Sequence, residues 1–179
     1  SGFLFAYNTA QVYIAAGMAK NILIVGSESL SNIVDWMDRG SCILFGDGAG
    51  AVVLREAQGE CKPFVTHSDG RKGDVLWCES RHQKGWETMN TNLKMDGKEV
   101  FKFAVKKVPA VINELLKENG CEKDEIDWFV LHQANKRIIE SVAKRMNLDI
   151  EKFPMNIQEY GNTSSASIPI LLDEMNQKG

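Results

Sequence analysis

Two polar side chains stand out because each follows an apolar or glycine-containing stretch and precedes a predicted helix. His132 comes after the apolar run at 128–131, and Asn162 lies in the string YGNTS at 160–164. In an open α/β sheet, such strand-to-helix junctions form the rim where ligands bind. A neutral imidazole N–H and an amide N–H can both donate hydrogen bonds without transferring a proton. These two residues are therefore the first candidates for a catalytic role.

Each candidate also has a plainer interpretation. A histidine at the end of an apolar strand is commonly a core residue whose ring nitrogens bond to the backbone. Asn162 could instead be the left-handed residue of a turn after Gly161, or the N-cap of the final helix. Thr163 and Ser164 compete for that cap, and this competition favours a free amide on Asn162.

Alternating apolar runs and amphipathic stretches indicate the elements that hold these residues in place. The alternation predicts an α/β fold with a mainly parallel sheet, in which the strands at 22–25 and 128–131 are buried on both faces. The expected helices cover residues 3–18, 101–116 (closed by Gly120), 136–146 and 164–175. The expected strands cover residues 22–25, 42–45, 51–54, 63–66, 128–131 and 154–157.

Two short motifs do not support the activities that they first suggest. The string GDGAG at 46–50 is not the GxGxxG of dinucleotide sites, and no Gly-Lys-Ser/Thr follows it. An apolar strand follows at 51–54, so no helix N-terminus is available for a phosphate, and we expect a tight turn instead. The string GSES at 26–29 lacks the second glycine of a GxSxG elbow, which disfavours a serine hydrolase.

Composition excludes several classes of protein. The chain has 179 residues, of which 44% are hydrophobic and 25% charged, as in globular proteins with a buried core. Its net charge of −3 does not favour nucleic acid, and no run approaches the ~18 apolar residues of a membrane span. Four scattered cysteines without a CxxC pair argue against a metal site or disulfides and predict a cytoplasmic protein in which they are small buried hydrophobes. They are Cys42, Cys61, Cys78 and Cys121.

The helix predicted at 136–146 carries a basic face. Arg137, Lys144 and Arg145 lie opposite its apolar stripe at helical spacing. Such a face is usually only solvated. The alternative is a docking surface that attracts an acidic partner through its charge.

Four motifs together resemble β-ketoacyl-acyl-carrier-protein synthase III, the initiating condensing enzyme of bacterial type II fatty-acid synthesis. They are LFGDGAGA at 44–51, GKEVFKFA at 97–104, HQAN at 132–135 and GNTSSAS at 161–167, in the family's order. Four strings in register are far more specific than any one of them.

The resemblance implies the thiolase fold, with part of its first βαβαβ half, most of its second, and helices between the layers. It divides the chain into three parts. Residues 1–60 would end the N-terminal half, residues 61–96 would form a connecting excursion, and residues 97–179 would make most of the C-terminal half. The family also implies a homodimer.

The activity implied is an acyltransferase reaction, a decarboxylating Claisen condensation. A cysteine takes an acyl group from a short acyl-CoA, malonyl-acyl-carrier protein decarboxylates, and the carbanion attacks the acyl-enzyme. His132 and Asn162 would stabilise the charge on the malonyl thioester oxygen. In the family the cysteine immediately precedes a Ser-Gly-Phe that is here Ser1-Gly2-Phe3, so we expect the nucleophile before Ser1 and absent from this chain. Coenzyme A thioester enters as a substrate, and no permanent cofactor is implied.

Further residues match the family's ligand positions. Arg39 would stack on the CoA adenine, although a salt bridge to Asp35 or Asp38 is the alternative. Phe101 would line the pantetheine tunnel, and it is equally compatible with a core position. The full set implied for substrate and CoA is Arg39, Phe45, Gly97, Phe101, Ala134 and Asn135. The set implied for docking the acidic acyl carrier protein is Lys102, Arg137, Lys144 and Arg145.

Two other hypotheses stay open. The protein could be a ketosynthase of secondary metabolism that uses a different acyl-CoA or extender. The chain could also be a non-catalytic piece that binds CoA or carrier protein without turnover. Residues 68–95 carry no interpretable pattern.

Overall fold

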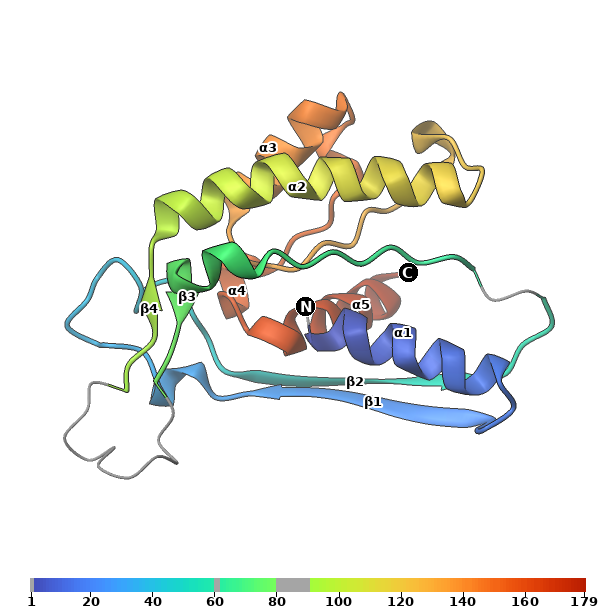
Figure 1. Ribbon diagram of the computed structural model, residues 1–179, viewed down its shortest axis with the longest axis horizontal. Helices are drawn as coiled ribbons and strands as arrows, with labels where there is room; N and C mark the ends of the chain where they lie inside the picture. Colours follow the sequence, from blue (N-terminus) through green and yellow to red (C-terminus); the bar gives the residue numbers. More distant parts are fainter. Residues whose placement is uncertain (1, 60–61, 80–90) are drawn as a thin grey trace.

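The computed structural model describes residues 2–59, 62–79 and 91–179. Figure 1 shows how its helices and strands are arranged, and short 3₁₀ turns are left out of the following description. In chain order they are α1 (Gly2–Ala15), β1 (Asn21–Glu28), β2 (Gly48–Arg55), β3 (Leu76–Trp77), β4 (Lys94–Met95), α2 (Gly97–Glu118), α3 (Lys136–Met146), α4 (Ile157–Tyr160) and α5 (Ser167–Lys178).

A long two-stranded ribbon carries two helices on one face. Strands β1 and β2 pair antiparallel from Asn21 opposite Arg55 to Glu28 opposite Gly48. Helices α1 and α5 lie side by side over this ribbon (Figure 1), and both contact it. Buried Phe3, Ile24 and Ile168 pack together there, so the last helix completes a core that the first helix begins.

A second core lies between α2 and α3, which Figure 1 shows on the opposite side of the molecule from the ribbon. Val142 of α3 is completely buried, and Phe129 stacks on Phe153 with ring centroids 5.0 Å apart. Helix α2 begins where the Asp96 carboxylate accepts hydrogen bonds from the first free backbone N–H groups. The segment that ends at His132 runs between the two cores, because Phe129 belongs to one and Val130 packs against the other.

A helix is found at each of the four predicted places, but only α3 has the predicted ends. Helix α3 covers the expected residues because Asn135 caps it, with its Oδ1 accepting from Arg137 N at 2.9 Å. Helix α5 tolerates Pro169 in its first turn, where a missing N–H costs nothing. Gly120 follows α2 at φ +62°, the left-handed conformation that ends helices.

The strand predictions are only partly right. Both described ladders, β1–β2 and β3–β4, are antiparallel, so the mainly parallel sheet is not found among the described residues. The link between β1 and β2 contains one 3₁₀ turn and no crossover helix, which is why β2 returns antiparallel. The four other predicted strands, at 42–45, 63–66, 128–131 and 154–157, form no ladder in the described part of the chain.

The expectation that β1 is buried on both faces is also wrong. Ile24 is 5% exposed, whereas Leu23 and Val25 are 64% and 59% exposed. Only the face beneath α1 and α5 is covered by described residues. An uninterrupted apolar run therefore does not reveal whether one face or both will be packed.

The cysteine prediction needs a similar correction. Cys42 and Cys121 are half-buried, but Cys78 is exposed, with its Sγ 3.0 Å from Thr91 O. Cys61 lies outside the described residues. Among the described residues no group of acidic, histidine or cysteine side chains could hold a metal ion. None of the described helices combines the length and apolarity that crossing a membrane requires.

Gly46 provides a test of this packing. A Cβ at Gly46 would lie 2.0 Å from Tyr160 O, so Gly46→Ala should cost about 1–3 kcal/mol of unfolding free energy. Gly73→Ala is the matched control, because nothing lies within 4 Å of that added atom. Denaturant unfolding of both variants measures the difference. Equal stability of the two variants would contradict the close approach.

Candidate active site

His132 is held at the junction before α3 by a hydrogen bond to α5. Its Nδ1 lies 2.6 Å from Ser167 Oγ, and Ser167 is buried at the first turn of α5. Burial lowers the pKa of His132 from its ordinary 6.5 to about 4. The ring is therefore neutral near pH 7, with one nitrogen that donates and one that accepts.

Asn162 is fixed through its backbone. Its N–H donates to Leu44 O at 2.8 Å, and its carbonyl accepts from Gly46 N at 3.0 Å. These two bonds form an isolated parallel bridge between Asn162 and Phe45. Gly161 precedes the bridge at φ +67° and ψ −160°, a conformation that essentially only glycine adopts. The loop at 160–164 is thus pressed against the turn at 44–46.

The side chain of Asn162 has one amide group without a hydrogen-bond partner among the described residues. Its Oδ1 accepts from Ser164 N at 2.9 Å. Because a backbone N–H can only donate, this bond identifies the amide oxygen and leaves Nδ2 as the donor atom of the side chain. The left-handed residue of the loop is Ser164, at φ +49°, and not Asn162. The turn-residue alternative for Asn162 is therefore wrong.

The predicted competition for the helix cap does not occur. Thr163 stands at the N-cap position of the 3₁₀ turn Ser164–Ala166, and its side chain caps nothing. Thr163 is instead buried, and its methyl group lies against Gly48. The Asn162 amide is thus oriented by the loop itself.

The two candidates belong to one hydrogen-bonded chain. His132 bonds to Ser167 Oγ, and the backbone N–H of Ser167 donates to Ser164 O. The N–H of the same Ser164 bonds to Asn162 Oδ1. The structure therefore brings together the two residues that the sequence singled out.

Glu28 is a site residue that the sequence did not reveal. Burial raises the pKa of its carboxyl, but hydrogen bonds from Ser165 outweigh this, and the pKa lies below its ordinary value. Glu28 Oε1 accepts from Ser165 N at 3.1 Å and from Ser165 Oγ at 2.5 Å, which ties the loop to the end of β1. Gly26 lets Ser165 approach, since a Cβ there would lie 2.6 Å from Ser165 O. Glu28 and Ser165 lie far apart in the sequence, so no local sequence pattern could have predicted their contact.

The start of α1 lies beside the same loop. A Cβ on Gly2 would be 3.3 Å from Ser165 Cβ, and Figure 1 shows the N-terminal end of α1 next to the start of α5. The positive end of the α1 dipole is therefore close to the loop that carries Asn162.

The predicted ligand residues are arranged unevenly around this centre. Phe45 is half-buried and bridged to Asn162, so it lies at the site. Arg39 is exposed, and within the described ranges it makes no ion pair with Asp35 or Asp38. Asp38 bonds instead to Ser41 and Gly40. The salt-bridge alternative for Arg39 is thus not found.

The remaining ligand residues lie near α2 and α3. Phe101 and Ala134 pack against the core between these helices, which supports the core interpretation of Phe101. Gly97 is exposed at the start of α2. Asn135 uses Oδ1 to cap α3, and its amide nitrogen has no hydrogen-bond partner among the described residues. Their roles toward CoA stay predictions.

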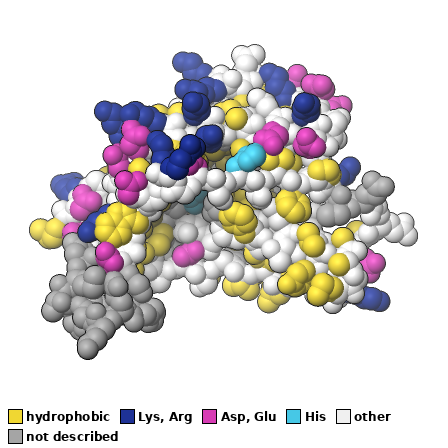
Figure 2. Space-filling view, viewed as in Figure 1, with side chains coloured by type: hydrophobic (Ala, Val, Ile, Leu, Met, Phe, Trp, Pro, Cys, Tyr) yellow, Lys and Arg dark blue, Asp and Glu magenta, His cyan; other side chains and the backbone are white. Residues whose placement is uncertain are grey.

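The basic residues form an exposed surface. Arg137, Lys144 and Arg145 are all exposed on α3, and within the described part of the chain none has a carboxylate partner. Lys102 is also exposed, but it pairs with Glu99 at 2.6 Å. Figure 2 shows Lys and Arg side chains gathered on the side where Figure 1 places α2 and α3.

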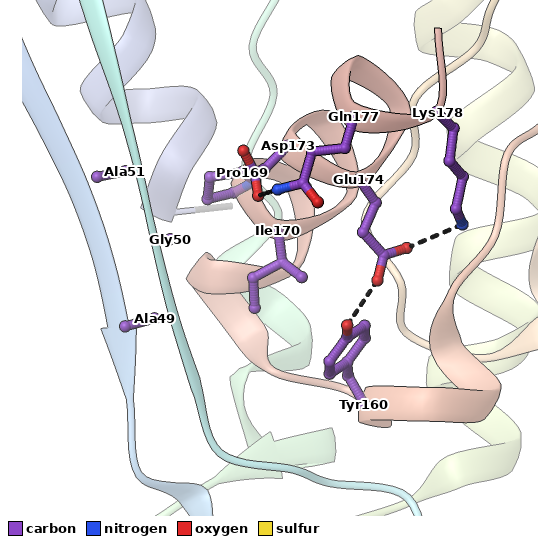
Figure 3. A pocket seen from close by; sticks show the side chains of 10 residues that line it. All are labelled: Ala49, Gly50, Ala51, Tyr160, Pro169, Ile170, Asp173, Glu174, Gln177 and Lys178. Carbon is purple, nitrogen blue, oxygen red and sulfur yellow. Dashed lines mark hydrogen bonds and ion pairs between the residues drawn. The ribbon is translucent and has the colours of Figure 1, made fainter.

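A groove of about 480 Å³ lies elsewhere, between β2 and α5. In Figure 3 Tyr160 points at Glu174, and its hydroxyl donates to Glu174 Oε1 at 2.6 Å while Lys178 approaches the same carboxylate at 3.6 Å. Neither His132 nor Asn162 lines this groove. The hydrogen bond between Tyr160 and Glu174 connects α4 to α5 and so holds the beginning of the loop at 160–164 in place.

Comparison with known proteins identifies the class of this fold. The structure superposes on the crystal structure of 3-oxoacyl-[acyl-carrier-protein] synthase III from Aquifex aeolicus VF5 with a TM-score of 0.87 and 40% identity, covering 100% of this chain and 56% of that one. The priming β-ketosynthase of the R1128 polyketide pathway gives a TM-score of 0.92 at 33% identity, covering 99% of this chain and 55% of that one. The chain therefore has the α/β fold of the thiolase-type condensing enzymes, as predicted.

The sequence comparisons narrow the class to a family. Residues 1–70 match the model of 3-oxoacyl-[acyl-carrier-protein (ACP)] synthase III, and residues 116–179 match the model of its C-terminal region. The β-ketoacyl-[acyl-carrier-protein] synthase III of Clostridium acetobutylicum is 46% identical, over 100% of this chain and 57% of its own length. The chain belongs to the synthase III family. It spans about half the length of the curated relatives that it matches.

Protonation of His132 should leave a signature in stability. The folded protein resists protonation down to about pH 4, whereas the unfolded chain takes up a proton below its ordinary pKa of 6.5. Between pH 6.5 and about pH 4 the chain therefore takes up a proton on His132 when it unfolds. The free energy of unfolding should fall as the pH drops through this range. Denaturant titrations should show a shallower fall for His132→Gln. Identical slopes would contradict the lowered pKa of His132 in the folded protein.

Proposed function

We propose that the whole protein catalyses the decarboxylating condensation of a short acyl-CoA with malonyl-acyl-carrier protein, which initiates fatty-acid synthesis. The observation that carries this proposal is the pair of neutral donors, His132 and Asn162, linked through Ser167 and Ser164 by hydrogen bonds. Family membership and the relatives' names support it.

The proposed chemistry needs neutral donors. When the C–C bond to the malonyl carboxylate breaks, carbon dioxide leaves and the electron pair forms an enolate on the thioester. His132 and Asn162 donate to the enolate oxygen, where preorganised hydrogen bonds lower the barrier. The enolate carbon then attacks the acyl thioester, forming the new C–C bond and releasing the enzyme's thiolate. No step requires either residue to take a proton.

The position of α1 supports a nucleophile just ahead of it. The beginning of α1 lies within contact distance of Ser165, in the loop that orients Asn162. A cysteine immediately before Ser1 would stand at the positive end of a helix, which favours its thiolate. We infer that this cysteine carries the acyl group in the whole protein.

We also infer that the basic face of α3 docks the acidic carrier protein. Arg137, Lys144 and Arg145 are exposed and unpaired among the described residues, which leaves their charge available to a partner. Docking on α3 places the carrier beside His132, which precedes this helix by four residues. The cytoplasmic location and the homodimer that the family implies belong to the same proposal.

A second candidate is a priming ketosynthase of polyketide synthesis. The R1128 enzyme matches the fold with a TM-score of 0.92, so the fold does not separate the two. The 46% identity to the Clostridium acetobutylicum relative favours fatty-acid synthesis. Competition between acetyl-CoA and larger acyl-CoA starters distinguishes them, because a polyketide enzyme would prefer a larger starter.

Removing either donor should affect the two half-reactions unequally. His132→Ala and Asn162→Asp in the whole protein should slow malonyl decarboxylation about 10²–10³-fold, because each removes a donor to the enolate oxygen. Asn162→Asp keeps the oxygen that accepts from Ser164 N, so the loop is preserved. Carbon dioxide release reports decarboxylation, and intact mass after incubation with acyl-CoA reports acylation.

The control is His67→Ala, which removes an exposed histidine paired with Glu114. Both half-reactions should keep their rates in this variant. Equal loss of acylation and decarboxylation in His132→Ala and Asn162→Asp would overturn the proposed roles.

Charge reversal tests the docking face. Arg137→Glu combined with Arg145→Glu should raise KM for malonyl-carrier protein, most strongly at low salt, and leave KM for acyl-CoA unchanged. Lys20→Glu is the control, an exposed charge next to the start of β1. Steady-state kinetics at two ionic strengths measure both constants. An unchanged KM for the carrier substrate in the double variant would contradict docking on α3.

A further inference from the structure

The hydroxyl of Ser167 has one proton and two acceptors within reach. His132 Nδ1 lies 2.6 Å from Oγ, and Ser164 O lies 3.0 Å from it. Gln133 N donates to the same oxygen at 3.4 Å. Ser167 is only 3% exposed, so water does not compete for these contacts. The direction of the hydroxyl therefore decides the tautomer of His132.

Two arrangements satisfy the geometry. In the first, the hydroxyl donates to Nδ1, and the imidazole carries its proton on Nε2. In the second, Nδ1–H donates to Oγ, the hydroxyl donates to Ser164 O, and Nε2 presents a bare lone pair. Only the first turns an N–H of His132 outward.

The first arrangement gives His132 an outward donor, as the proposed function requires, and it leaves Ser164 O with a partner. Ser164 O already accepts the backbone N–H of Ser167, so it needs no second donor.

We propose that Ser167 is a positioning residue, whose hydroxyl donates to Nδ1 and holds His132 as the Nε2–H tautomer. The inference rests on the proposed function, because it explains how His132 becomes a donor to the enolate oxygen. In the other tautomer the Nε2 lone pair would face the developing negative charge and repel it. Ser167 thereby selects between donor and acceptor at the reacting end of the ring.

Nitrogen NMR of the wild-type protein reads the tautomer directly. The chain has three histidines, so ¹⁵N-histidine labelling gives few signals, and loss of one set in His132→Gln identifies that of His132. At pH 7 we expect Nε2 to be protonated and Nδ1 to show the shift of a bare nitrogen that accepts a hydrogen bond. A protonated Nδ1 in the wild-type protein would overturn the inference.

Variants of Ser167 test the consequence for the reaction. Ser167→Ala should mix the two tautomers and slow malonyl decarboxylation by roughly tenfold or more, because a catalytic histidine in the wrong tautomer loses activity. The rate of acylation should change less than twofold. Ser167→Thr retains the hydroxyl and should restore the single tautomer and most of the rate. A Ser167→Ala variant with wild-type tautomer and wild-type decarboxylation would refute the role.

The two proposals fail separately. If Nδ1 is protonated while His132→Ala still loses decarboxylation selectively, the role of Ser167 is wrong and the function stands. If the tautomer is as expected and depends on the Ser167 hydroxyl, but His132→Ala decarboxylates normally, the proposed function fails and the positioning contact stands.

Discussion

The backbone pairing of Asn162 with the turn at 44–46 is the contact on which the rest of the site depends. Two hydrogen bonds, to Leu44 O and from Gly46 N, join segments that are far apart in the chain. The approach is so close that a single Cβ at Gly46 would strike Tyr160 O. Gly161 supplies the backbone conformation that such a turn requires. Without this pairing, nothing would hold the loop and its asparagine near the N-terminal end of α1.

The orientation of the donors follows from that pairing. Once the Asn162 backbone is fixed, Ser164 turns back to bond Asn162 Oδ1, and Ser167 comes within reach of His132. Glu28 holds the same loop through a hydrogen bond from the backbone N–H of Ser165. Each proposed donor is therefore held by a partner that is itself fixed, and the proposed stabilisation of charge requires such preorganised groups. The low pKa of His132, caused by burial, keeps the ring neutral and suited to donating without proton transfer.

Much of the fold could be predicted from local signals. Helix α3 has its predicted bounds because a capping asparagine and an apolar stripe lie next to each other in the sequence. His132 and Asn162 could be singled out because they occupy junctions where few other polar side chains compete. The strands were harder to predict, since an extended run such as 128–131 becomes a strand only when a partner pairs with it. An apolar run also does not predict which faces of a strand are covered, because Leu23 lies in the apolar run of β1 and is nevertheless exposed.

The supporting residues could not be predicted because their contacts are long-range. Ser167 is one of several serines in a short string, and only the fold shows that its hydroxyl meets a histidine from another element. Glu28 ends a strand like many exposed acidic residues, and its bonds to Ser165 appear only once the loop is in place. The resemblance to synthase III supplied the roles of the donors, whereas the structure supplied the groups that orient them.

The most direct test of the account is a crystal structure of the whole protein with a non-decarboxylating malonyl thioester analogue bound. The account predicts that His132 Nε2 and Asn162 Nδ2 both lie within hydrogen-bonding distance, about 2.7–3.2 Å, of the thioester oxygen. Asn162 Oδ1 should at the same time keep its bond to Ser164 N. A thioester oxygen bound by other groups, with His132 or Asn162 turned away from it, would contradict the account.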